Sequence, residues 1–141
     1  MQNKTYILEH EQDSRDFAKQ LANTIKPGSI LVFNGDLGAG KTFLCREIIK
    51  ELCGSQTRII SPTFNLLQTY DYKDIVIYHF DLYRLKNPSE IYELGIEDAL
   101  SGNICLIEWP DIIANILPED TIHIKIEIDG ADKRKVTLGT I

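Results

Sequence analysis

Eight residues in the first third of the chain have the types and the spacing of a phosphate-binding loop. The sequence GDLGAGKT, residues 35–42, matches the pattern G-x-x-x-x-G-K-[ST] at every fixed position. Its glycines allow backbone conformations in which successive N–H groups converge on phosphate oxygens, and the helix expected after it adds the partial positive charge of its N-terminus. Lys41 should reach the β- and γ-phosphates of a nucleotide, and the Thr42 hydroxyl should bind Mg²⁺. The predicted loop comprises Gly35, Asp36, Leu37, Gly38, Ala39, Gly40, Lys41 and Thr42.

Two carboxylates follow apolar runs further along the chain. Asp81 ends the run IVIYHFD, and Glu108 ends the run ICLIE. Chemistry gathers at the carboxyl ends of parallel strands, so both groups should lie near the loop if their strands run beside the strand before it. Either carboxylate could hold Mg²⁺, directly or through water, while the other orients or deprotonates the attacking water. The sequence leaves open which of the two contacts the metal.

The segment SPTF, residues 61–64, lies between the phosphate loop and Asp81. Many P-loop proteins have a segment there that senses the γ-phosphate. Thr63 or Ser61 would supply a hydroxyl to the metal or to the attacking water. A plain turn at Pro62 is an equally weighted alternative.

Two ring side chains close to the carboxylates have open roles. Trp109, the only tryptophan, directly follows Glu108. It either packs at the strand end, the commoner outcome, or lies beside the nucleotide. His79 precedes Asp81 by two residues and shares its strand face. On spacing alone, a structural histidine is more common there than a catalytic one.

Hydrophobic periodicity predicts the elements that would position these groups. Strands are expected within residues 5–10, 29–35, 58–72 (two pieces broken by Pro62), 74–85, 103–110, 121–128 and 133–139, with a hairpin turn at 129–132. Helices are expected from a cap at Asp13 or Ser14 to Ile25, from the loop to Gly54, and within 89–100 after a cap at Asn87 or Ser89. These elements predict a three-layer α/β P-loop domain over residues 1–141. Its sheet should be mixed and mainly parallel, with antiparallel additions from the alternating tail segments.

Composition limits the partners of the chain. A length of 141 residues with 43% hydrophobic and 26% charged residues is typical of one globular domain. A net charge of -6 argues against a DNA- or RNA-binding surface, so any tRNA contact should run through a partner protein. No segment has the length and apolarity of a membrane span or signal peptide, so we expect a cytoplasmic protein. Cys45, Cys53 and Cys105 lack metal-ligand spacing and are interpreted as core thiols.

The motifs GDLGAGKT, SPTF, HFDLYR and IEWP, in this order and spacing, resemble those of the bacterial TsaE family, also called YjeE. This family is the P-loop ATPase component of the machinery that makes threonylcarbamoyladenosine at position 37 of tRNA. The resemblance covers nearly the whole chain. It implies ATP and Mg²⁺ as cofactors, slow hydrolysis by the protein alone, and action with the proteins TsaD and TsaB, with tRNA contacted only indirectly.

The resemblance also implies roles for single residues. Lys41 and Thr42 match the phosphate and magnesium residues of the family, and residues 61–64 match its switch-like segment. Asp81 and Glu108 match its two acidic residues, with Trp109 beside the second.

Two other functions share the phosphate loop. A small-molecule kinase would need an acceptor site and usually an arginine-bearing lid, whereas the five arginines of this chain are widely scattered. A non-hydrolysing adaptor would use ATP only to hold a docking surface in shape. The guanine-reading sequence N-K-x-D does not occur after the loop, which favours ATP over GTP.

Overall fold

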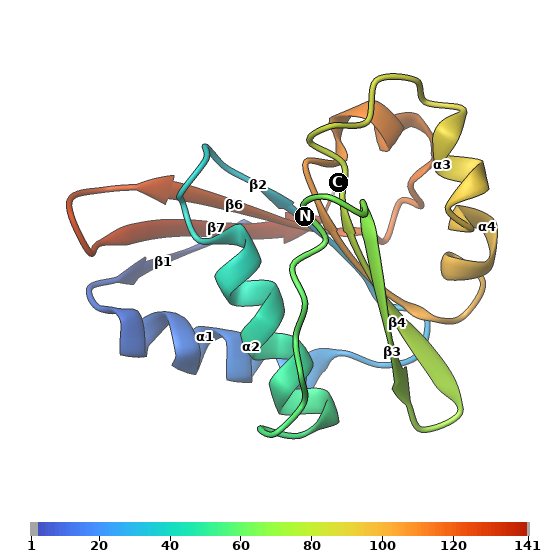
Figure 1. Cartoon of the computed structure of the whole chain (residues 1–141). Coiled ribbons are helices and arrows are strands. Elements are labelled where there is room, and N and C mark those ends of the chain that lie inside the picture. Colours follow the sequence, from blue (N-terminus) through green and yellow to red (C-terminus); the bar gives the residue numbers. More distant parts are fainter. Residues whose placement is uncertain (1–2, 141) are drawn as a thin grey trace.

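The computed structural model describes residues 3–140, which form one mixed sheet with the strand order β1-β7-β6-β2-β5-β4-β3 and helices on both faces (Figure 1). The strands are β1 (Lys4–Leu8), β2 (Ile30–Asn34), β3 (Leu67–Tyr72), β4 (Ile75–Asp81), β5 (Ile104–Glu108), β6 (Ile122–Ile128) and β7 (Arg134–Thr140). The helices are α1 (Glu11–Thr24), α2 (Lys41–Cys53), α3 (Glu90–Glu93), α4 (Ile96–Ala99) and the 3₁₀-helix η1 (Pro110–Ile116). None of these helices is long and apolar enough to cross a membrane.

The predicted three-layer arrangement and the mixed sheet are confirmed. The four central strands β6, β2, β5 and β4 are parallel, and antiparallel strands are added at both edges. Alternate side chains of β2 enter two cores: Leu31 and Phe33 pack in the core that includes α1 and α2, and Ile30 and Val32 in the core that includes α3, α4 and η1. Because both faces of β2 are covered, its sequence is a continuous apolar run.

The start of α1 differs from the prediction. The helix begins at Glu11, so neither Asp13 nor Ser14 is the residue that precedes it. The Asp13 carboxylate instead accepts hydrogen bonds from the backbone N–H groups of Glu9 and His10, each at 3.0 Å. Asp13 therefore stabilises the helix end from within the first turn.

The two strand pieces expected within residues 58–72 are one strand, β3, preceded by a turn. The Leu66 N–H donates to the Pro62 carbonyl oxygen at 2.8 Å, and Leu66 has a positive φ of 68°. The backbone of Ile60 is held by the Tyr70 hydroxyl, which lies 3.2 Å from its nitrogen and 3.3 Å from its oxygen. The Tyr70 side chain, rather than hydrogen bonds to a neighbouring strand, thus holds the segment that leads to SPTF.

The remaining predicted elements differ mainly in their bounds. The expected helix within residues 89–100 consists of α3, which follows Ser89, and α4, separated by Gly95 at a φ of 85°. The hairpin at 129–132 joins β6 to β7 as predicted, and the Asp129 N–H donates to the Lys133 carbonyl oxygen at 2.9 Å.

Candidate functional site

The predicted phosphate loop connects β2 to the first residue of α2. Gly38 and Gly40 have positive φ angles of 81° and 112°, a region that residues with a side chain rarely adopt. A Cβ atom at Gly35 would lie 2.5 Å from the Ile126 carbonyl oxygen, so this glycine allows the loop to lie against β6. Substitution of these glycines would distort the loop.

Lys41 is buried at the start of α2, with 4% of its surface exposed. Its Nζ donates to the carbonyl oxygens of Gly35 at 2.5 Å and Asp36 at 2.9 Å, and lies 4.2 Å from the centroid of the Trp109 ring. Burial lowers the Lys41 pKa, and the negative charge of Glu108 partly opposes this shift. The loop therefore holds its cation among carbonyl oxygens and an aromatic face.

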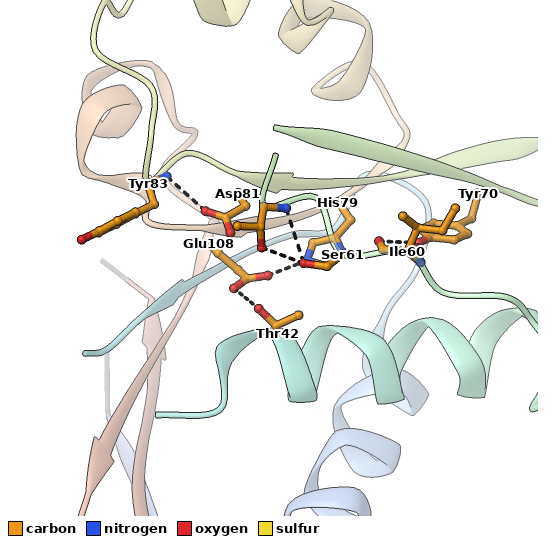
Figure 2. A network of polar contacts seen from close by, with 9 residues as sticks. Thr42, Ile60, Ser61, Tyr70, His79, Asp81, Tyr83 and Glu108 are labelled. Carbon is orange, nitrogen blue, oxygen red and sulfur yellow. Dashed lines mark hydrogen bonds and ion pairs between the residues drawn. The ribbon is translucent and has the colours of Figure 1, made fainter. Parts of the chain in front are cut away.

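The two predicted carboxylates come together because β4 and β5 are parallel neighbours in which Asp81 lies opposite Glu108. Glu108 is 1% exposed, and its Oε1 accepts a hydrogen bond from the Thr42 hydroxyl at 2.6 Å (Figure 2). Its Oε2 lies 2.7 Å from Nε2 of His79. The structure thus brings Asp81 and Glu108 together, as expected for residues at the carboxyl ends of parallel strands, and Thr42 of α2 contacts Glu108 there.

Asp81 is slightly less enclosed than Glu108, with 6% of its surface exposed. Its Oδ1 accepts a hydrogen bond from the Tyr83 N–H at 3.1 Å (Figure 2). Burial raises the Asp81 pKa, and the Tyr83 N–H and the neighbouring Lys41 only partly oppose this shift. Ionising this carboxyl group therefore costs more in the folded protein than in water.

The raised pKa predicts that Asp81→Asn stabilises the protein at neutral pH. Folding favours the protonated form of Asp81, so its contribution to stability is present below the unfolded pKa of about 3.9 and is lost as the pH rises through the folded pKa. We expect the variant to melt at a higher temperature than the wild type at pH 7, and this difference to vanish near pH 3. Calorimetry at both pH values tests this, with exposed Asp120→Asn as the control. A lower melting temperature at pH 7 would show that the Asp81 charge stabilises the fold.

A cavity of about 270 Å³ lies between the loop and the ends of β4 and β5. Besides Phe43 and Tyr83, its lining contains nine of the predicted site residues: Leu37, Gly38, Gly40, Lys41, Thr42, Thr63, Asp81, Glu108 and Trp109. Gly35 and Asp36 instead support Lys41 through their carbonyl oxygens, and Ala39 lines a second hollow on the other side of the loop.

Thr63 and Trp109, whose roles the sequence left open, both line this cavity. The hydroxyl of Thr63 lies 2.7 Å from that of Ser61, so Ser61 can hold the Thr63 hydroxyl in place. Trp109 has a left-handed backbone with a φ of 56°, and its ring centroid lies 4.7 Å from that of Tyr83. The tryptophan is therefore part of the cavity wall rather than of the core.

Arg134 of β7 supports the loop from the side opposite to the cavity, and sequence reasoning missed it. Its Nε donates to the Ala39 carbonyl oxygen at 2.9 Å. It also lines the second hollow, of about 250 Å³, which shares Gly40 and Phe43 with the first cavity. No local motif could have identified this contact, because Arg134 and Ala39 are 95 residues apart.

Cys45 lies beside the carboxylate cluster, although the cysteine spacing predicted no such placement. Its sulfur and ligand atoms of His79 and Glu108 lie within 4.8 Å of one another. Burial raises the Cys45 pKa well above its usual range, so the thiol stays protonated and packs as a core residue. Cys105 is also buried, Cys53 is half-buried, and all three cysteines are free.

Known proteins resemble this chain over almost its whole length. A family model described as "Threonylcarbamoyl adenosine biosynthesis protein TsaE" matches residues 8–136. The tRNA threonylcarbamoyladenosine biosynthesis protein TsaE of Rickettsia bellii is 58% identical over 134 residues, which cover 95% of this chain and 93% of that protein. The protein of the same name from Bacillus subtilis is 36% identical over 92% of this chain and 81% of its own length. The crystal structure of Bacillus subtilis YdiB has a TM-score of 0.81 at 29% identity, covering 99% of this chain and 86% of that chain.

Proposed function

Because the chain belongs to the TsaE family of threonylcarbamoyl adenosine biosynthesis proteins, we propose that it binds ATP with Mg²⁺ and hydrolyses the ATP slowly during this tRNA modification. In this proposal it acts with TsaD and TsaB at position 37 of tRNA. The net charge of -6 supports contact with partner proteins rather than with the tRNA itself. We also propose that residues 1–141 form a single domain, which the one continuous sheet supports, and that the protein is cytoplasmic, which its free cysteines support.

The main support for the proposal comes from three oxygen-bearing side chains that line the same cavity as Lys41, those of Thr42, Asp81 and Glu108. The Thr42 hydroxyl contacts Glu108 at 2.6 Å, and Asp81 is paired with Glu108 across the two strands. A hydroxyl and two carboxylates are the hard oxygen ligands that Mg²⁺ prefers, so these residues fit the metal. Bound there, Mg²⁺ would neutralise charge on the β- and γ-phosphate oxygens. Lys41 would contact the same phosphates from the loop side.

The two carboxylates are suited to different tasks. Both oxygens of Glu108 are already engaged, one by Thr42 and the other by His79, which suits a group that holds a metal ligand in place. Asp81 has a raised pKa, which makes it a better proton acceptor than an ordinary aspartate. We therefore assign Asp81 to orient and deprotonate the attacking water, and Thr63, which faces the same cavity, to the γ-phosphate side.

Phosphate release from Mg-ATP tests the proposed function. We expect slow release by the purified protein, faster release when TsaD, TsaB and tRNA are added, and no release by Lys41→Ala under either condition. Tight ATP binding without hydrolysis under all these conditions would leave the adaptor instead. Phosphate transfer that requires an added small-molecule acceptor would indicate a kinase.

A further inference from the structure

We propose that His79 is a positioning residue, which donates its Nε2–H to Glu108 and so keeps that carboxylate aligned on Thr42. This inference rests on the proposed function, because the site that it organises is the ATP site. His79 is fully buried on β4, and its Nε2 lies 2.7 Å from Oε2 of Glu108 (Figure 2). Spacing alone favoured a structural histidine.

The location of His79 separates it from an ordinary core residue. Burying a polar side chain is costly unless it is hydrogen-bonded, and few are buried in this protein. The buried polar or charged residues among residues 3–140 are Lys41, His79, Asp81, Glu108 and Thr121. Of these, only Thr121 lies outside the site, where its hydroxyl donates to the Pro118 carbonyl oxygen. The imidazole is therefore buried where its hydrogen bond acts on the other site residues.

The hydrogen bonds assign the tautomer of the ring. Carboxylate oxygens accept hydrogen bonds, so we assign the hydrogen of the short contact with Glu108 to Nε2 of His79. The other ring nitrogen, Nδ1, is buried and has no hydrogen-bond partner among the described residues. A bare lone pair at that position leaves no buried N–H donor unsatisfied, which favours the Nε2–H tautomer. The donor of His79 is thus directed to the carboxylate alone.

Fixing Glu108 has a consequence for Thr42. Oε2 is held by the ring, so Oε1 stays in place to accept the Thr42 hydroxyl hydrogen at 2.6 Å. A hydroxyl that donates to a carboxylate keeps its own lone pairs available to accept or to bind a cation. His79 thereby acts through Glu108 on Thr42 and contacts no substrate in this scheme. Partners of this kind typically change metal affinity or activity by about 10- to 100-fold.

Two amide variants separate positioning from a structural role. Gln carries its amide nitrogen at the ε position, as His does, and can reach Glu108, whereas the shorter Asn cannot. We expect His79→Gln to keep most of the wild-type turnover and His79→Asn to lose about 10- to 100-fold in kcat and to need more Mg²⁺. His123→Leu, a change of a half-buried histidine on β6, is the control. Both His79 variants bury an amide, so a merely structural role would lower their melting temperatures together and leave kcat of the folded protein unchanged.

A spectroscopic measurement tests the inference independently of hydrolysis. The ¹⁵N chemical shifts of the His79 ring in the wild-type protein should show the Nε2–H tautomer. The Nδ1–H tautomer, or equal kcat in the Gln and Asn variants, would overturn the inference, even if the wild type hydrolyses ATP. A wild type without hydrolysis would instead contradict the proposed function, and the tautomer would still decide the role of His79.

Discussion

Replacing Lys41 by alanine is expected to weaken Mg-ATP binding by about 100-fold or more, because hydrogen bonds to charged groups contribute about 1.5–3 kcal/mol each. The Lys41 ammonium group already lies in the loop, held by the carbonyl oxygens of Gly35 and Asp36. Alanine would remove the cation and leave these carbonyl oxygens without their hydrogen-bond donor. The loop N–H groups and the start of α2 would remain, but they carry only partial charges.

Calorimetric titration with Mg-ATP measures this effect directly. Lys19→Ala, which removes an exposed lysine from α1, is the matched control and should bind as the wild type does. A thermal melt of each variant separates loss of the site from loss of the fold. Wild-type affinity in a folded Lys41→Ala protein would show that the nucleotide binds elsewhere.

Glu108→Gln is expected to lower ATP turnover by about 100-fold, the upper end of the range for groups that hold a metal ligand in place, while ATP still binds. Glutamine has nearly the same shape, but it is neutral and replaces one acceptor by an NH₂ group. That group would face either the Thr42 hydroxyl or Nε2 of His79, both of which donate to Glu108 in the structure as we interpret it. The change therefore removes the negative charge beside the metal site and one of the two hydrogen bonds that Glu108 accepts.

Steady-state phosphate release gives kcat and KM for this variant. Glu97→Gln, at an exposed position on α4, is the matched control. Unchanged kcat would mean that Glu108 has only a structural role. If Glu108→Gln and Asp81→Ala both support tRNA modification in a reconstituted system while Lys41→Ala does not, hydrolysis is unnecessary and the adaptor is correct.

The sequence predicted those strands in which burial determines the pattern of apolar and polar residues. The run SILVFNG was predicted as a central strand because β2 is covered on both faces, and the alternating tail segments form the β6–β7 hairpin. The apolar residues Ile59 and Ile60 favoured a strand that does not form. Their segment lies outside the sheet and is held by the Tyr70 hydroxyl, a contact that periodicity cannot reveal.

The same distinction between local patterns and contacts of distant segments applies to the candidate site. The loop could be predicted because its residues are contiguous, and the approach of Asp81 to Glu108 followed from the assumption of parallel strands. The sequence placed His79 on the same strand face as Asp81, but the structure pairs its ring with Glu108, 29 residues away. Pairing between distant segments depends on strand order, which the sequence did not reveal.

The contact between Arg134 and Ala39 bears on when the protein becomes functional during its synthesis. Among the described elements, β7 is the last to be made, yet it pairs with the first strand, β1, and its arginine supports the phosphate loop. When α2 has left the ribosome but β7 has not yet been made, the phosphate loop lacks the contact with Arg134. At that stage β1 also lacks its partner strand. Such long-range pairing forms late and slowly. We therefore expect the growing chain to gain its full nucleotide affinity only after β7 has emerged.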